Sequence, residues 1–188
     1  MTKVPFYSQL RPLILPSEAI SRALPQNGKI IDLGCGQGLL AKYLASVSTR
    51  NVVGVDLDQE RIPKTEQKNL SFIRNDIRTF NLAGANGAVL SDVLHHLSKN
   101  DQQVLLKNIA KTLKKGGVLV LKEIDTNEFV RSKLSRLWDF VLYPKDKIYF
   151  SSAAHFKKTL EDLGFTVEIT RPSRLFPGST TLFLCTKK

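Results

Sequence analysis

Short apolar runs alternate along the chain with segments whose apolar residues recur at helical spacing. Five of these runs have the length of strands, at Lys29–Leu33, Asn51–Asp56, Leu70–Ile73, Gly87–Asp92 and Val118–Lys122. Helical segments separate most of them. Strands that alternate with helices indicate βαβ units, so we expect an α/β fold with a mostly parallel sheet and helices on both of its faces.

The helices are predicted from apolar spacing and from end signals. The clearest begins at Ser98, which can cap it, and Leu105 and Ile109 mark its apolar face. Others are expected at Leu39–Ser46, from about Asp58, and at Ser152–Leu163. The helix near Asp58 should be short or kinked, because Pro63 falls within its first turns.

The two ends of the chain depart from this alternation. The strands predicted at Thr166–Thr170 and Thr180–Cys185 have no helix between them, so they should pair antiparallel at one edge of the sheet. Residues 1–27 contain a predicted helix at Ser17–Leu24 and are expected to cover the sheet. Residues 126–150 are aromatic-rich and form a candidate lid helix. We expect the whole chain to be a single domain.

The composition suits a globular protein and excludes a disordered or fibrous chain, since 42% of the 188 residues are hydrophobic and 24% are charged. No apolar run approaches the roughly 20 residues of a membrane-spanning helix. The net charge is +11, from 28 basic and 17 acidic residues, and it forms no basic run. Such a charge can attract RNA, an anionic membrane surface or an acidic small molecule.

Two cysteines, Cys35 and Cys185, are too few for a disulfide framework or a four-cysteine metal site. The N-terminal residues lack the uninterrupted apolar core of a signal peptide, because Pro12 and Pro16 fall within them. We therefore expect a cytoplasmic protein without a bound metal.

The most informative stretch is residues 30–38, which read Ile-Ile-Asp-Leu-Gly-Cys-Gly-Gln-Gly. Glycines between a strand and a helix allow a sharp turn and the close approach of a ligand to free backbone N–H groups. A nicotinamide site would need its third glycine at position 39, which is Leu39. Asp32 is also out of place in such a site, because the loop there must accept a pyrophosphate.

The loop resembles that of the class I S-adenosylmethionine-dependent methyltransferases, and the resemblance extends over nearly the whole chain. It implies a Rossmann-like fold with seven strands in the order 3-2-1-4-5-7-6, the seventh antiparallel. It also implies S-adenosyl-L-methionine as the cofactor and S-adenosyl-L-homocysteine as the product. The loop residues that would hold the methionine end of the cofactor are Asp32, Gly34, Cys35, Gly36 and Gly38.

Five further positions extend the expected cofactor site. Asp56 ends the second strand, where a carboxylate can accept hydrogen bonds from both ribose hydroxyls, and Leu57 follows it. The resemblance assigns the adenine amino group to Asp76 and the face of the adenine ring to Ile77. Asp92, at the end of the fourth strand, would line the same edge of the sheet.

Two histidines follow the fourth strand, where an acceptor would lie. Methyl transfer is an in-line displacement that depends on alignment, and a base assists when the acceptor is a hydroxyl. The stretch Val93–Lys122 resembles small-molecule O-methyltransferases, whose histidine base matches His95, although His96 stands where they usually carry an acid. His95 is thus a candidate base, with cofactor-lining, packing or surface roles as the alternatives.

Comparison with other methyltransferase classes narrows the acceptor. The fourth strand is not followed by the Asp/Asn-Pro-Pro-aromatic motif of enzymes that methylate nucleobase amino groups. Asp92 and Lys122 match the middle of the Lys-Asp-Lys-Glu set of RNA ribose 2′-O enzymes, but Thr181 stands near the place of the closing glutamate. We therefore interpret Lys122 as a surface or rim charge.

The resemblance as a whole predicts transfer of a methyl group to a small, apolar or lipid-like acceptor. His96, Tyr7 and Trp138 are the expected pocket residues. An RNA methyltransferase and a non-catalytic cofactor-binding module are the alternatives. Residues 126–150 can serve as a lid, as a packed helix, as a dimer surface or as a contact with an anionic membrane surface.

Overall fold

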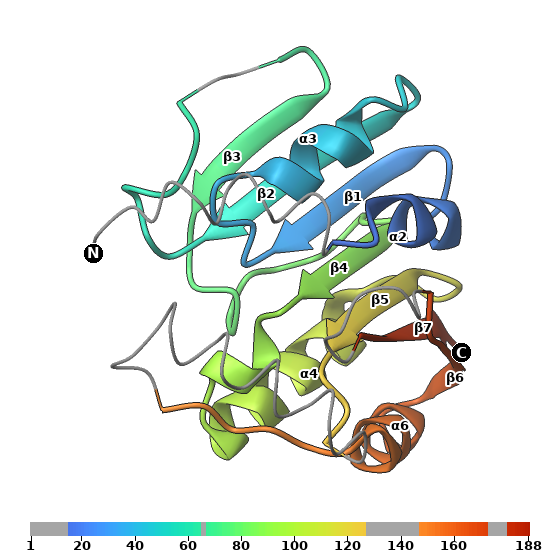
Figure 1. The fold of residues 1–188 in the computed structure, drawn as a ribbon. Helices are drawn as coiled ribbons and strands as arrows, with labels where there is room; N and C mark the ends of the chain where they lie inside the picture. Colours follow the sequence, from blue (N-terminus) through green and yellow to red (C-terminus); the bar gives the residue numbers. More distant parts are fainter. Residues whose placement is uncertain (1–14, 65–66, 127–146, 173–179) are drawn as a thin grey trace.

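A computed structural model describes residues 15–64, 67–126, 147–172 and 180–188 of the protein. These residues form one twisted sheet with helices on both faces (Figure 1). In chain order the elements are α2 (Ser17–Ala23), β1 (Gly28–Leu33), α3 (Leu39–Ala45), β2 (Arg50–Asp56), β3 (Leu70–Arg74), β4 (Gly87–Ser91), the short 3₁₀ helix η1 (Leu94–His96), α4 (Lys99–Thr112), β5 (Val118–Glu123), α6 (Ala153–Asp162), β6 (Phe165–Thr170) and β7 (Thr181–Lys187).

The strand order is β3-β2-β1-β4-β5-β7-β6, as the sequence predicted. Every pairing among the first five strands is parallel, whereas β7 runs antiparallel to both β5 and β6. Only ten residues, 171–180, separate β6 from β7, and this connection is too short for the crossover that a parallel pairing needs.

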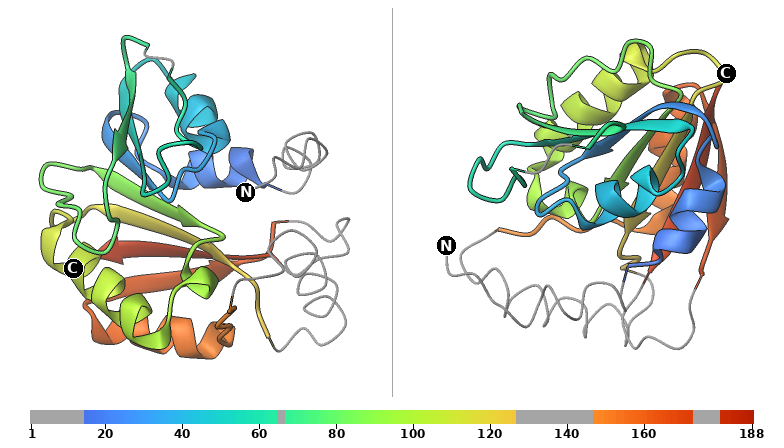
Figure 2. Two further views of the ribbon diagram at one scale, coloured as in Figure 1. Left: turned by 90° about the vertical axis from the view of Figure 1, so that its left-hand side faces the viewer. Right: turned by 90° about the horizontal axis from the view of Figure 1, so that it is seen from above.

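Two layers of helix cover the sheet (Figure 2). On one face, α2 and α3 bury Ile20, Leu40 and Leu44 against strand residues that include Ile30, Val52, Val89 and Val120. On the other face, α4 and α6 bury Leu105, Ile109, Phe156 and Leu160 against Ile31, Leu33, Leu90 and Leu121. Each fully buried leucine or isoleucine stabilises the fold by about 1.5–3 kcal/mol relative to an exposed one.

The serines predicted to start α4 and α6 do so. Ser98 Oγ accepts a hydrogen bond from the Asp101 N–H, and Ser152 Oγ accepts one from the His155 N–H. Such a cap stabilises a helix by roughly 1 kcal/mol because it satisfies an otherwise unpaired donor. None of the helices that the structure describes is long and apolar enough to cross a membrane.

The prediction of a helix from about Asp58 is wrong. Residues 57–64 form turns instead. The Asp58 carboxylate accepts a hydrogen bond from the Glu60 N–H, and the Arg61 N–H donates to the Asp58 carbonyl, so the chain is held in a tight turn. An Asp that bonds backbone two residues ahead competes with helix formation, and Pro63 lacks the donor that a helix would need.

Candidate active site

The sheet register brings the predicted site residues to one edge. Leu33 at the end of β1 pairs with Val55 in β2 and with Leu90 in β4. The glycine loop, Asp56 and Asp92 therefore follow neighbouring strands at the carboxyl edge, where open parallel sheets bind ligands. The strand order reverses between β1 and β4, so the edge is also the topological switch point.

The glycine loop is fixed against β2. The Gly36 N–H donates to Asp56 Oδ2 at 2.8 Å, and the Asp58 N–H donates to Asp56 Oδ1 at 3.0 Å. Gly38 precedes α3 with a φ of +70°, and a Cβ at this position would lie 2.6 Å from the Phe72 ring. The loop thus requires glycine at position 38, both for its left-handed backbone and for space.

Asp32 in β1 and Cys35 in the glycine loop are both buried. Burial raises the pKa of the Cys35 thiol far above its ordinary value, and the Asp32 and Asp56 carboxylates raise it further. A thiol held neutral in this way is neither a nucleophile nor a metal ligand. Cys35 is therefore a buried packing residue of the loop.

Asp76 is held by an arginine. Arg78 donates from Nε and Nη2 to the Asp76 carboxylate, at 3.1 Å and 2.6 Å from Oδ2, and from Nη1 to Asp101 Oδ1 at 2.8 Å. The Arg78 hydrogen bond lowers the pKa of Asp76. Ile77 is partly buried and packs against the core on the α4 side of the sheet. Arg78 thus ties the predicted adenine loop to the first turn of α4.

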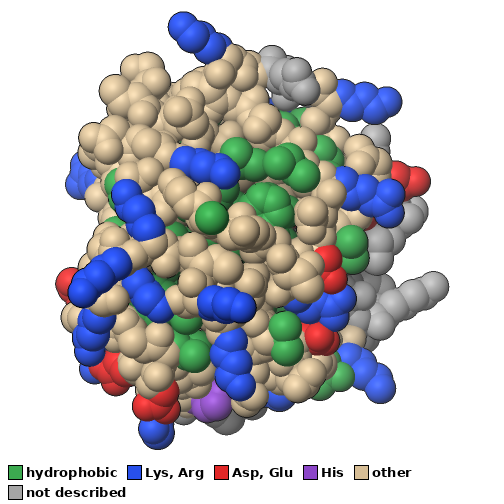
Figure 3. Space-filling view, turned by 180° about the vertical axis from the view of Figure 1, so that it is seen from behind, with side chains coloured by type: hydrophobic (Ala, Val, Ile, Leu, Met, Phe, Trp, Pro, Cys, Tyr) green, Lys and Arg blue, Asp and Glu red, His purple; other side chains and the backbone are tan. Residues whose placement is uncertain are grey.

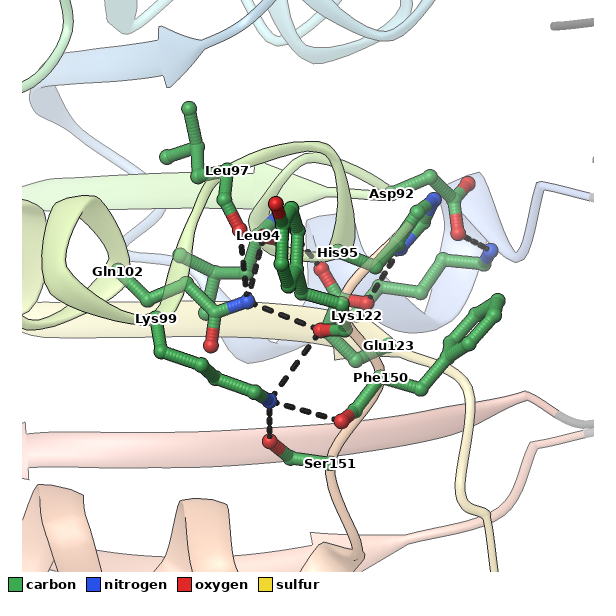
Figure 4. A network of polar contacts seen from close by, with 11 residues as sticks. Asp92, Leu94, His95, Leu97, Lys99, Gln102, Lys122, Glu123, Phe150 and Ser151 are labelled. Atoms are coloured by element: carbon green, nitrogen blue, oxygen red, sulfur yellow. Dashed lines mark hydrogen bonds and ion pairs between the residues drawn. The ribbon is translucent and has the colours of Figure 1, made fainter. Parts of the chain in front are cut away.

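A buried histidine–glutamate pair lies beyond β4 (Figure 4). His95 Nδ1 is 2.6 Å from Glu123 Oε2, and both side chains are at most 2% exposed. Glu123 Oε1 accepts the Leu94 N–H at 2.8 Å, so its two oxygens fix both the backbone and the ring of η1. The His95 ring also lies against the rings of His96 and Phe150, with centroids 4.4 Å and 5.5 Å away.

Residues from α4 hold the segment that carries Phe150. Gln102 Nε2 donates to the carbonyls of Leu94 and Tyr149, both at 2.9 Å, and the Tyr149 N–H donates to the His95 carbonyl. Lys99 Nζ donates to the Phe150 carbonyl at 2.7 Å and also bonds the hydroxyl of Ser151 (Figure 4). Segment 149–151 is therefore clamped over η1.

Lys122 is not the surface or rim charge that the sequence predicted. Its side chain is 4% exposed, and its ammonium lies 2.5 Å from Asp92 Oδ1. Asp92 adopts a φ of +57°, which is uncommon outside glycine, and its N–H donates to the Lys122 carbonyl. Successive residues of a strand point to opposite faces, so Lys122 reaches Asp92 while Glu123 reaches His95.

A family model described as a methyltransferase domain matches residues 8–169. The chain belongs to this methyltransferase family. The match and the strand order confirm the expected resemblance to class I S-adenosylmethionine-dependent methyltransferases, with S-adenosylmethionine as the cofactor.

The relatives of this methyltransferase domain act on different molecules. Carboxy-S-adenosyl-L-methionine synthase of Staphylococcus epidermidis is 25% identical over 135 residues, 69% of this chain and 58% of that protein. Ribosomal protein L11 methyltransferase of Chromobacterium violaceum is 32% identical over 107 residues, 56% of this chain and 35% of that protein. The chain spans about half the length of the curated relatives it matches.

Solved structures share the fold. Human N-acetylserotonin methyltransferase in complex with S-adenosylmethionine superposes with a TM-score of 0.76 at 19% identity, covering 97% of this chain and 55% of that one. At this identity the likeness shows the fold alone.

The residues at the carboxyl edge fit the cofactor of the family. The loop presents backbone rather than side chains at three glycines, and Asp56 stands at the end of β2 beside it. Leu57 is 59% exposed, although it is a large aliphatic residue next to the site. A bound adenosine would give this side chain an apolar surface to pack against. Tyr7 and Trp138, the other expected pocket residues besides His96, lie outside the described residues.

Sequence reasoning missed Glu123 and Gln102 and counted Phe150 only among the aromatic residues of the candidate lid. Glu123 directly follows Lys122 at the end of a predicted strand. Because side chains alternate along a strand, the sequence could have indicated that Glu123 points to the opposite face from Lys122. Gln102 carried no local signal, because its partners come from η1 and from residue 149.

Replacing Arg78 by Met should destabilise the methyltransferase domain at neutral pH, and the difference should shrink below about pH 4. The folded pKa of Asp76 lies below its unfolded value, so its contribution is present above the unfolded pKa and is lost as pH falls through the folded one. Thermal melts across pH would measure this. Arg74→Met is the control, because Arg74 bonds the Leu57 carbonyl and its effect should not vary in this range.

Proposed function

We propose that this methyltransferase domain methylates a hydroxyl group of a small, apolar acceptor, with His95 as the general base. The observation that carries the proposal is the buried contact between His95 Nδ1 and Glu123. S-adenosylmethionine supplies an electrophilic methyl group on a sulfonium. The protein must then align the acceptor hydroxyl with that methyl group and accept its proton.

Glu123 supports His95 in two ways. A carboxylate on Nδ1 holds the imidazole in the tautomer whose Nε2 accepts the hydroxyl proton, and it stabilises the imidazolium that forms. Glu123 also anchors the Leu94 N–H, which fixes the backbone from which the ring projects. An ionised partner in a buried site acts strongly because little water screens it.

For the cofactor, we propose that Asp56 binds the ribose hydroxyls and that the glycine loop contacts the methionine end. Asp76, Ile77 and Leu57 would surround the adenine. The exposed Leu57 side chain and the oriented Asp76 carboxylate support this arrangement. Asp92 closes the edge between cofactor and acceptor, with its charge balanced by Lys122.

The acceptor would bind on the Phe150 side of His95. Because the His95 side chain is 2% exposed and the Phe150 ring stacks on it, we expect segment 149–151 to move when an acceptor binds. The Phe150 ring beside His95 favours an apolar molecule. N-acetylserotonin methyltransferase and the O-methyltransferase NcsB1, which was solved with a naphthoic acid, are fold relatives whose names state such acceptors.

Methylation of an RNA ribose hydroxyl is the second candidate, since Asp92 and Lys122 do meet. Two observations favour the small acceptor over it. Thr181 lies opposite Glu123 in the β5–β7 pairing, where it supplies no carboxylate, and Glu123 itself is committed to His95.

The proposal is tested by transfer of a labelled methyl group from S-adenosylmethionine to a panel of phenols and to RNA. We expect transfer to a phenol, its loss in His95→Gln, and its retention in the control His155→Gln, which replaces an exposed histidine of α6. Transfer to RNA alone would support the second candidate. Binding of S-adenosylhomocysteine without transfer to either class, or equal activity in His95→Gln, would favour a non-catalytic cofactor-binding module.

A further inference from the structure

The outer side of α4 and the turn after it carry lysines without acids between them. From Gln102 to Lys122 the chain contains five lysines and no Asp or Glu. Four of the lysines are exposed, and together we name them the lysine face: Lys107, Lys111, Lys114 and Lys115. Positions four apart on a helix differ by about 40° around its axis, so the two helical lysines point the same way.

The end of β7 adds to the same region. The Gly116 N–H donates to the Lys187 carbonyl at 2.9 Å, which places the last residues of β7 beside the turn that follows α4. The Lys187 ammonium bonds the Ala110 carbonyl of α4 and lies 5.4 Å from the centre of the Phe165 ring. Lys188 follows and is exposed. Lys187 at the end of β7 and the following Lys188 thus extend the lysine face.

The lysines of α4 are spaced differently from those of α6. In α6, Lys157 pairs with Glu161 and Lys158 pairs with Asp162, each four residues on. In α4, the residue four after Lys107 is Lys111. Two like charges at this spacing repel each other, whereas the opposite charges at the same spacing in α6 attract.

The helix dipole does not account for this spacing. Cations are favourable in the last turn of a helix, but Lys107 lies before that turn of α4. The uncompensated charge points to a partner outside the chain that is itself anionic. Figure 3 shows this side of the molecule, where Lys and Arg side chains outnumber Asp and Glu.

We propose that the lysine face binds the phosphate backbone of RNA without regard to base sequence. A row of cations along a helix matches a row of phosphates. An anionic membrane would favour large apolar side chains beside the lysines, and Val104 is the exposed large apolar residue that the structure describes on α4. Among the exposed large hydrophobic residues that the structure describes, only Tyr43 of α3 is aromatic. The described surface therefore offers few side chains on which bases could stack.

This surface is separate from the candidate active site. The lysine face lies toward the C-terminal end of α4, whereas His95 precedes its N-terminal end. RNA binding there goes beyond the proposed methyl transfer and does not depend on which acceptor is methylated.

Fluorescence anisotropy with a labelled RNA of mixed sequence tests the proposal in a salt series. The four lysines of the lysine face are replaced by Gln, and the control replaces Lys42, Lys64, Lys68 and Lys158 by Gln, which gives the same net charge. We expect the slope of log K against log salt to fall by about 3 in the lysine-face variant, since each phosphate contact contributes roughly 0.7–0.9. In the control quadruple variant, the slope of log K against log salt should change by less than about 1.

A single variant separates binding from folding. Lys107→Glu places a carboxylate four residues before Lys111, the favourable order for a helical ion pair, so its melting temperature should equal or exceed that of the parent. Its RNA affinity should nevertheless fall. Equal losses in the two quadruple variants, no salt-dependent RNA binding, or binding only to phosphatidylglycerol vesicles would each overturn the proposal.

Discussion

Replacing Glu123 by Gln is expected to slow methyl transfer to a hydroxyl acceptor by about 100-fold, the lower range for loss of general-base assistance. The amide oxygen can still accept the Leu94 N–H, so the η1 backbone should remain in place. The amide nitrogen, however, donates toward His95 Nδ1. The proton is then driven to Nε2, which can no longer accept one from the acceptor.

The rate with a phenol acceptor measures the effect, and NMR of the His95 ring protons reports the change of tautomer independently of activity. Asp125→Asn is the matched control, because Asp125 is another buried carboxylate just beyond β5 that bonds the Ala153 N–H and Arg171. It should leave the rate within about threefold. If the Glu123→Gln protein transferred the methyl group at the parent rate, His95 would not be the general base.

Asp56→Asn should weaken S-adenosylhomocysteine binding by about 2–3 kcal/mol, the upper part of the range for hydrogen bonds to a charged group. A carboxylate accepts from two ribose hydroxyls, whereas an amide offers one oxygen and a nitrogen that cannot accept. At a concentration near 100 times the parent's dissociation constant, the ligand stabilises the parent by about 2.7 kcal/mol, or roughly 5–10 °C. In the variant the shift should fall below about a third of that.

Asp58→Asn controls for local charge. Asp58 follows Asp56 by two residues, and its carboxylate accepts the Glu60 N–H of the turn, whereas the Asp58 backbone N–H that donates to Asp56 is retained in this variant. The melting shift produced by S-adenosylhomocysteine should persist in this protein, and NAD should produce none in either. A full shift in Asp56→Asn would mean that the ribose binds elsewhere.

The glycine loop shows how far local sequence reaches. A strand that ends in alternating glycines and then enters a helix has few backbone solutions, and Gly38 adopts the left-handed conformation that its residue type allows. Asp56 was assigned to the carboxyl end of its strand from the apolar run before it, and β2 ends there. Apolar periodicity and turn-forming residues act over a few neighbouring positions, so the elements that they predict are present in the folded protein.

The residues after β2 show where local reasoning fails. The polar stretch from Asp58 has helical composition, but its side-chain-to-backbone bond and Pro63 favour turns. Lys122 was interpreted as a surface or rim charge because lysine is seldom buried. Its burial depends on Asp92, thirty residues earlier, and on a strand register that no local pattern encodes.

The sequence by itself determined the alternation of strands and helices, the strand order through its resemblance, the cofactor loop and the position of Asp56, because each follows from neighbouring residues or from a recognisable motif. The tertiary structure alone decided that His95 pairs with Glu123 and that Lys122 pairs with Asp92. It also decided that Lys99 and Gln102 hold segment 149–151. These contacts join residues 28 to 52 positions apart, so they exist only once the parallel strands have brought their carboxyl ends together.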